Sequence, residues 1–346
     1  MAFDPNAASL PDSGVFGLPG SEADAKVILL PVPFDATTSY GKGASKGPAA
    51  ILEASKQVDL FDLETGRPYE AGLFMLDESQ DVVRWNETGN ALSSKVIEAA
   101  GLVEGKPELE AALREVNAIS GQVNDFVHGE SKRLLDAGKI VGLVGGDHAV
   151  PFGCIRAHAE RFPGLSVLHF DAHADLRPAY EGFEWSHASI MHNVLRKTSI
   201  ARLVQVGIRD LSEEEFAQIE GSGGRVVTFY DVDLKRAKRS GEPFDDVAMR
   251  VASTLGEQVY VSFDIDGLDP ALCPHTGTPV PGGLAFDEAC AVLEAVVRSG
   301  RRIVGFDLNE VAPGEHDEWD ANVGARLLYK LIGWTLVSQG LSRPPR

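Results

Sequence analysis

Short hydrophobic runs alternate with longer amphipathic stretches along most of this chain. The runs are rich in β-branched residues, and several contain no polar position, as is typical of strands buried on both faces of a parallel sheet. Eight of them predict strands, at residues 26–34, 72–76, 140–144, 166–170, 203–208, 226–230, 259–265 and 302–307.

Between these runs, apolar residues recur with a helical period, which predicts helices at residues 110–137, 152–161, 245–255, 287–298 and 322–339. Strands that alternate with helices predict a three-layer α/β/α fold with a mostly parallel eight-stranded sheet. We expect residues 26–346 to form a single domain, and residues 1–25 an extension that packs on the surface or on a neighbouring subunit. Residues 77–107 are polar without clear periodicity, so we expect an excursion inside the single domain there.

The chain is acidic: 51 Asp and Glu residues against 32 Lys and Arg residues give a formal net charge of −19. This charge repels phosphate backbones and anionic lipid, which excludes nucleic acids and membranes as expected partners and leaves cationic small molecules or metal ions. No apolar run approaches the roughly 18–20 residues that span a bilayer, and residues 1–19 lack the basic start of a secretory signal. With three widely spaced cysteines, these features predict a cytoplasmic protein.

Acidic and histidine residues follow three of the predicted strands. Residues 145–148 read GGDH, residues 171–175 read DAHAD and residues 264–270 read DIDGLDP. Ligands of parallel α/β sheets bind beyond the carboxyl ends of the strands. Residues at i, i+2 and i+4 of an extended segment point to one face, so the side chains of each motif can project into a common site.

Such a cluster of carboxylates requires cations, because like charges at close range oppose ionisation and folding. Two divalent ions balance four Asp residues, and carboxylates with a minority of imidazoles favour Mn²⁺, with Ni²⁺ or Co²⁺ as alternatives. A cysteine-rich zinc site is excluded by composition. Each motif alone has a structural explanation as a turn or a helix cap. Together they predict six metal ligands: His148, Asp171, His173, Asp175, Asp264 and Asp266.

GGDH, DAHAD and SFDIDGLDP resemble the signatures of the ureohydrolase family of arginases, agmatinases, guanidinobutyrases and formimidoylglutamases, over residues 26–336. The resemblance implies the arginase-type fold, a binuclear manganese site, and a homotrimer or homohexamer. It also implies that Asp171 and Asp264 bridge the two metals. One metal would then be held by His148, Asp171, Asp175 and Asp264, and the other by His173, Asp171, Asp264 and Asp266.

Two metals that share a water make hydroxide available near neutral pH, for attack on a guanidinium carbon. The resemblance implies that Glu310 orients the guanidinium, that His187 shuttles a proton, and that Asp175 belongs to the catalytic residues as well as to the ligands. It places Thr278 in the substrate pocket. The structural alternatives are a loop cap for Glu310 and an uninvolved residue at a helix start for His187.

Residues 176–185, LRPAYEGFEW, are expected to contact the substrate's tail. Arg177 disfavours a second positive charge and can pair a substrate carboxylate, unless Glu181 or Glu184 takes it in a structural ion pair. Aromatic residues of the segment can form a box suited to guanidine or an alkylated guanidine: Tyr180, Phe183 and Trp185. The segment looks closest to an agmatinase-like branch that includes guanidine and metformin hydrolases. We therefore expect a small or carboxylated guanidino compound to be preferred over agmatine and arginine.

Four alternatives stay open at this point. The first is a formimidoylglutamase of the same family. A zinc deacetylase on the same fold uses one metal and fewer ligands than the six here. A non-catalytic subunit of a hetero-oligomer is expected to lose ligands, although a need for a paralogous partner subunit is compatible with a full set. A metal-storage or sensing protein has no need of Glu310 and His187.

Overall fold

A single eight-stranded sheet forms the centre of the computed structural model, which describes residues 3–10 and 12–345. The strand order is β2-β1-β3-β8-β7-β4-β5-β6, and every neighbouring pair is parallel, which confirms the predicted sheet. The strands are β1 (Val27–Val32), β2 (Leu73–Met75), β3 (Ile140–Gly145), β4 (Ser166–Phe170), β5 (Arg202–Ile208), β6 (Val226–Tyr230), β7 (Gln258–Asp264) and β8 (Arg302–Asn309).

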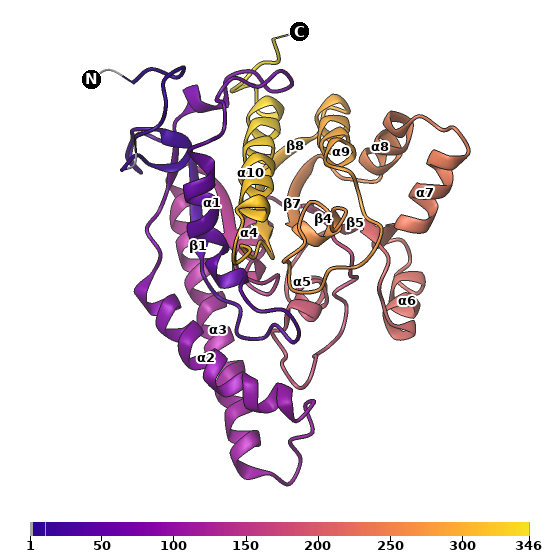
Figure 1. Ribbon diagram of the computed structural model, residues 1–346. Helices are drawn as coiled ribbons and strands as arrows, with labels where there is room; N and C mark the ends of the chain where they lie inside the picture. The colour runs from indigo at the N-terminus through magenta and orange to yellow at the C-terminus, as the bar shows by residue number, and fades with distance from the viewer. Residues whose placement is uncertain (1–2, 11, 346) are drawn as a thin grey trace.

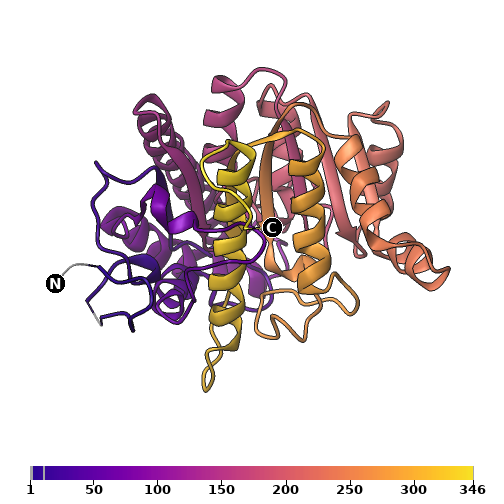
Figure 2. The same cartoon turned by 90° about the horizontal axis from the view of Figure 1, so that it is seen from above.

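Helices cover both faces of this sheet, so the predicted three layers are also confirmed (Figures 1 and 2). One face carries α1 (Gly47–Ser55), α7 (Asp231–Arg239), α8 (Phe244–Ser253), α9 (Phe286–Arg298) and α10 (Trp319–Ser338). The other face carries α2 (Gln80–Glu98), α3 (Pro107–Asp136), α4 (Phe152–Arg161), α5 (Ile190–Lys197) and α6 (Glu213–Glu220).

The apolar strands fill two separate cores, one on each face of the sheet. In β1, Val27 and Leu29 belong to one core, whereas Ile28 and Leu30 belong to the other. Successive side chains of a strand point to opposite faces, so a central strand needs apolar residues at every position. This requirement explains why the strands are continuous hydrophobic runs in the sequence.

Residues 77–107, in which the sequence shows no clear periodicity, contain helix α2 (Gln80–Glu98). Its buried positions are Val82, Gly89, Ser93 and Val96, which follow a helical spacing. Gly89 lies close to the side chain of Ala36, and a Cβ at this glycine would be 2.7 Å from that methyl group. Two of the four buried positions are therefore small rather than apolar, which hides the helical period from a hydrophobicity pattern.

Part of the N-terminal extension packs on this chain's own surface. Val15, Phe16 and Leu18 are buried. The backbone N–H of Phe16 donates to Oγ of Ser55 in α1 (2.8 Å), and its ring centroid lies 4.8 Å from that of Tyr329 in α10. Of the described helices, none has the length and apolar character needed to cross a membrane.

The strand order determines which polar residues meet. β3, β8, β7 and β4 are consecutive in the middle of the sheet and run in one direction. Their carboxyl ends therefore lie side by side, and the segments that follow them carry the GGDH, NE, DID and DAHAD residues. Chemistry-bearing residues up to 162 positions apart in sequence are brought to one edge in this way.

Candidate metal centre

His148 follows β3 and lies among three carboxylates. Its Nδ1 atom is 2.9 Å from Oδ2 of Asp171, 3.2 Å from Oδ2 of Asp175 and 3.4 Å from Oδ2 of Asp264. All four side chains are buried. The fold thus brings together the four residues that the resemblance assigns to the first metal.

His173 forms a second group beside the first. Its Nδ1 atom lies 3.1 Å from Oδ2 of Asp266 and 3.4 Å from Oδ1 of Asp171. The two oxygens of Asp171 therefore face different imidazoles, Oδ2 toward His148 and Oδ1 toward His173. A carboxylate placed in this way can bridge two cations. Two sets of donor atoms each lie close enough together to hold one ion: those of His148, His169, Asp171 and Asp175, and those of Asp171, His173 and Asp266.

The electrostatics of the cluster reflect its density of buried charge. Burial, together with the negative charge of Asp171, raises the pKa of Asp175 to about 8, and burial with Asp266 raises that of Asp264 well above its usual range. Burial by itself lowers the pKa of His173, but the attraction of Asp266 and Asp171 outweighs it and raises this pKa to about 12. The carboxylates thus hold protons on the imidazoles, and divalent cations can replace those protons because metal ligation releases them.

Two residues of the site adopt a backbone conformation that non-glycine residues rarely take. Asp175 has φ 56° and Glu310 has φ 62°. Such left-handed conformations cost of order 1–3 kcal/mol each and persist where surrounding structure holds them. Here the strain aims two carboxylates toward the same edge of the sheet.

Glu310 follows β8 and has one engaged and one unengaged carboxylate oxygen. Oε1 accepts a hydrogen bond from the backbone N–H of His148 at 2.9 Å. Oε2 is buried and has no hydrogen-bond partner among residues 3–10 and 12–345. Burial, with the negative charges of Asp147 and Asp266, raises the pKa of Glu310 well above its usual range. A buried, unpaired oxygen of this kind is suited to a cationic hydrogen-bond donor.

The loop that contains Thr278 closes against the same carboxylates. The Oγ1 atom of Thr278 donates to Oδ2 of Asp266 (3.4 Å). A Cβ at Gly277 would lie 3.2 Å from Oε2 of Glu310, so the glycine leaves room beside that oxygen. Thr278 is thus next to a metal-ligand candidate, and its place in the substrate pocket stays a prediction.

His187 lies beside the second group. Its imidazole donates to the backbone carbonyl of Thr37, and its ring centroid is 6.3 Å from that of Tyr180. Burial and the positive charge of His173 lower the pKa of His187 to about 4. The imidazole is therefore neutral at pH 7 and able to accept a proton.

Arg177 has a different partner from the two that we expected. Its Nε atom lies 3.5 Å from Oε2 of Glu215, and its Cζ atom lies 5.4 Å from the ring centroid of Tyr180. Glu215 also accepts a hydrogen bond from the backbone N–H of Leu176 through Oε1 (3.0 Å). The guanidinium is thus held by α6, because this helix begins against the segment, and not by its sequence neighbours Glu181 and Glu184.

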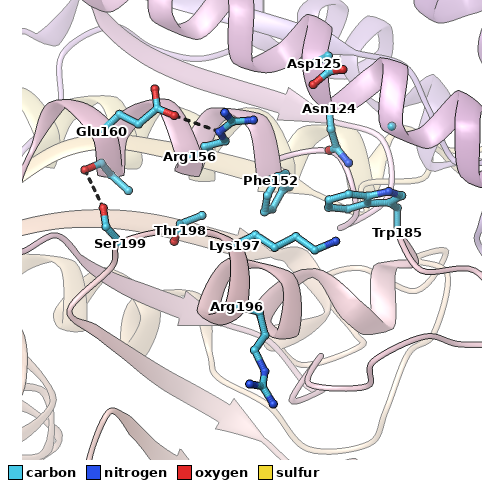
Figure 3. A pocket seen from close by; sticks show the side chains of 12 residues that line it. Asn124, Asp125, Phe152, Arg156, Glu160, Trp185, Arg196, Lys197, Thr198 and Ser199 are labelled. Atoms are coloured by element: carbon cyan, nitrogen blue, oxygen red, sulfur yellow. Dashed lines mark hydrogen bonds and ion pairs between the residues drawn. The ribbon is translucent and has the colours of Figure 1, made fainter.

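The three aromatic residues of the expected box point to three different places. Phe183 is fully buried in a small core between α2 and α3. The Trp185 ring packs 4.8 Å from that of Phe152 in α4, and it lines a groove whose described lining includes none of the six ligand candidates (Figure 3). Only Tyr180 stays near His187. Trp185, which we expected to bind substrate, packs against Phe152 of α4, and its contact with substrate stays a prediction.

Sequence reasoning missed several polar residues that support the ligand candidates. His169 places Nε2 2.7 Å from Oδ2 of Asp171. The Nε2 atom of His148 lies 3.0 Å from Oγ of Ser262, whose hydroxyl donates to Oδ1 of Asp307 at 2.9 Å. The sequence contains a sign of these contacts, because His169, Ser262 and Asp307 are polar residues inside hydrophobic strands. Burial of a polar residue without a partner is costly there.

Comparison with known proteins gives one consistent result. A sequence model described as the arginase family matches residues 25–333. The chain is 37% identical over 313 residues to an N(1)-aminopropylagmatine ureohydrolase of Thermus thermophilus, covering 90% of each chain. It is 31% identical over 312 residues to an agmatinase of Bacillus subtilis, covering 90% of this chain and 91% of the relative.

Solved structures agree with the sequence comparison. The agmatine ureohydrolase of Thermoplasma volcanium superposes with a TM-score of 0.70 at 25% identity, covering 93% of each chain. The sequence match therefore covers the same residues that form the eight-stranded parallel sheet and the clustered His and Asp side chains. The chain belongs to the arginase family, and it is a hydrolase that acts on carbon–nitrogen bonds of guanidino compounds.

Proposed function

We propose that this protein hydrolyses the guanidino group of a small cationic substrate with two divalent metal ions, and releases urea and an amine. The observation that best supports this proposal is the buried, unpartnered Oε2 of Glu310 beside the two His–Asp groups. A guanidinium is a planar cation with several N–H donors, which matches a carboxylate that still lacks donors.

The donor set fits two hard divalent cations. Four carboxylates and two imidazoles offer oxygen-rich coordination with a formal charge of −4, and Asp171 faces both groups. Mn²⁺ is our first candidate, and Ni²⁺ the second. Such a pair of ions, when bound, lowers the pKa of a shared water so that hydroxide is available near neutral pH.

Two residues carry the remaining chemistry. Glu310 orients the guanidinium so that its carbon lies beside the metal centre. His187, neutral at pH 7 and fixed by its hydrogen bond to Thr37, accepts a proton as the carbon is attacked and passes it to the leaving amine. Asp175 supports both steps by holding the ligand cluster together through its contact with His148.

For the substrate's tail, we favour a second positive charge. The expectation of a carboxylated tail depended on Arg177, and the contact between Arg177 and Glu215 removes that basis. Asp210, exposed at the edge of the site with Oδ2 4.0 Å from Nε2 of His173, is a counter-charge for a tail amine. The named relatives act on agmatine or N(1)-aminopropylagmatine, which both carry such an amine.

The test is urea release by the purified chain loaded with Mn²⁺ and, separately, with Ni²⁺. The panel contains agmatine, N(1)-aminopropylagmatine, arginine, guanidine, 4-guanidinobutyrate and formimidoylglutamate, with acetyl-lysine for the deacetylase alternative. We expect the first two to give the highest kcat/KM, with two metal ions per chain by elemental analysis. Highest turnover of guanidine or guanidinobutyrate would reject the cationic tail, and no urea from any substrate would reject the function.

We also propose a cytoplasmic homotrimer or homohexamer. The three cysteines are buried and unpaired among the described residues, as suits a reducing compartment. Light scattering of the purified protein measures the assembly directly. A monomer that is fully active would contradict this proposal, and activity only after addition of a paralogous chain would indicate a hetero-oligomer.

A further inference from the structure

A groove of about 670 Å³ is lined by residues of α3, α4 and α5 and of the segments next to α5 (Figure 3). One wall is aromatic, because the rings of Phe152 and Trp185 pack 4.8 Å apart. The Lys197 amine lies 3.8 Å from the centroid of the Trp185 ring. Ligand sites commonly combine such an apolar wall with a few polar groups.

The groove has an excess of positive charge on a chain whose formal net charge is −19. Its basic residues are Arg156, Arg196 and Lys197, against Asp125 and Glu160. Within residues 3–10 and 12–345, neither Arg196 nor Lys197 forms an ion pair with a carboxylate.

Glu160 offsets little of this charge. Its carboxylate is shared by two partners, with Oε1 3.0 Å from Nε of Arg156 and Oε2 3.0 Å from Nε2 of His128. Burial lowers the pKa of Lys197, and the negative charge of Glu184 offsets only part of this effect, so a closer counter-charge would stabilise the charged amine. An anion in the groove can supply that charge.

Asn124 provides an independent indication of a ligand. This residue of α3 lines the groove and is only 6% exposed, yet its side-chain amide makes no hydrogen bond with any described residue. Figure 3 shows the amide directed toward the space beside Trp185. The amide thus reaches the groove, and its donors and its acceptor are available there to a ligand.

We propose that this groove binds a small organic anion with a flat body, a carboxylate or a phosphate ester. When the ligand binds, the Lys197 amine leaves the face of the Trp185 ring and contacts the charged group together with Arg156. The flat part takes the place of the amine on the ring and forms a hydrogen bond with Asn124. The site is separate from the proposed catalytic function, since its described lining contains none of the metal-ligand candidates.

The test is calorimetric titration of the full-length metal-loaded protein at low ionic strength with phenyl phosphate, benzoate, inorganic phosphate and neutral benzyl alcohol. We expect phenyl phosphate or benzoate to bind at least tenfold more tightly than inorganic phosphate and benzyl alcohol. The stronger of the two identifies the anionic group. Absence of binding, or equal affinity for phenyl phosphate and inorganic phosphate, would overturn the proposal.

Four variants locate the binding. Lys197→Gln is expected to weaken it at least tenfold and Lys197→Arg to restore it, whereas Lys132→Gln, an exposed lysine of α3 paired with Asp136, leaves it unchanged. Asn124→Leu removes an unpaired buried amide, so it is expected to weaken binding at least fivefold without lowering the Tm. Binding that is insensitive to both Lys197→Gln and Asn124→Leu would place the anion elsewhere and overturn the proposal.

Discussion

The backbone N–H of His148 donates a hydrogen bond of 2.9 Å to Oε1 of Glu310. This contact joins the residue that begins the first ligand group to the carboxylate proposed to hold the guanidinium. It also fixes which oxygen of Glu310 remains for substrate, since Oε2 has no partner in the described chain. A guanidinium on Oε2 is consequently held next to the metal centre and cannot bind far from it.

Substitution Glu310→Gln is expected to reduce kcat/KM at least about 100-fold. The amide keeps the shape but loses the charge, and hydrogen bonds to charged groups contribute about 1.5–3 kcal/mol each. Steady-state urea release on the preferred substrate measures the loss. Because burial raises the pKa of Glu310, the neutral amide should fold with an unchanged or higher Tm. A variant with full activity would show that this carboxylate only caps the loop.

Replacement of His187 by Asn is expected to lower kcat about 100-fold while KM changes less than about threefold, as for loss of a general acid–base group. The metal content should stay at two ions per chain, because His187 is not among the six ligand candidates. Addition of free imidazole offers a further check, since it should restore part of the rate. An equal fall in metal content and rate would instead assign His187 to the metal site.

Metal removal should make stability depend on pH. His173 and Asp175 both have a raised pKa in the folded, metal-free chain, about 12 and about 8. A raised pKa stabilises the fold below the unfolded value and this contribution is lost as pH rises toward the folded value. The Tm in EDTA should therefore fall as pH rises from 5 to 8. Saturating Mn²⁺, at about 100 times Kd, should add about 2.7 kcal/mol per site.

Two matched variants distinguish the effect of the ligand cluster on the pH dependence of Tm from the effect of the chain's overall negative charge. Asp175→Asn removes one titrating group of the cluster, so it should flatten the fall of Tm in EDTA. Asp233→Asn removes an exposed carboxylate that pairs only with Arg236 among the described residues, so it should not. Equal pH profiles for both variants would mean that overall negative charge, rather than the ligand cluster, causes the effect.

The strands and the cluster of ligand candidates could be predicted from the sequence because each corresponds to a pattern of neighbouring residues. A strand buried on two faces is a continuous apolar run, and ligands at i, i+2 and i+4 of its end share a face. Helix α2 could not be found in this way, since Gly89 and Ser93 occupy buried positions through close packing rather than hydrophobicity.

The contacts made by the side chains of residues 176–185 could not be predicted from the sequence either. Phe183 and Trp185 are two residues apart, yet one enters the core between α2 and α3 and the other packs on α4. Arg177 pairs with Glu215, 38 positions away, rather than with an adjacent acid. These outcomes depend on where α2, α4 and α6 lie in space, which no local pattern specifies.

The link from His148 through Ser262 to Asp307 yields the sharpest test of the metal centre. Ser262 lies on the side of the imidazole opposite the carboxylates, so it orients the ring without touching a metal. Partners of this kind typically contribute 10–100-fold to metal affinity. Ser262→Ala should therefore weaken Mn²⁺ binding about 10–100-fold, measured by calorimetric titration of the metal-free protein.

Ser166→Ala is the matched control for Ser262→Ala. Ser166 is likewise a buried serine in a central strand, but it lies at the start of β4 and accepts a hydrogen bond from the backbone N–H of Gly256. Its loss should cost stability without changing Mn²⁺ affinity. If the two variants weaken metal binding equally, the effect of Ser262 is general destabilisation. If only Ser262→Ala does, and kcat at saturating Mn²⁺ stays near wild type, the serine acts by orienting His148.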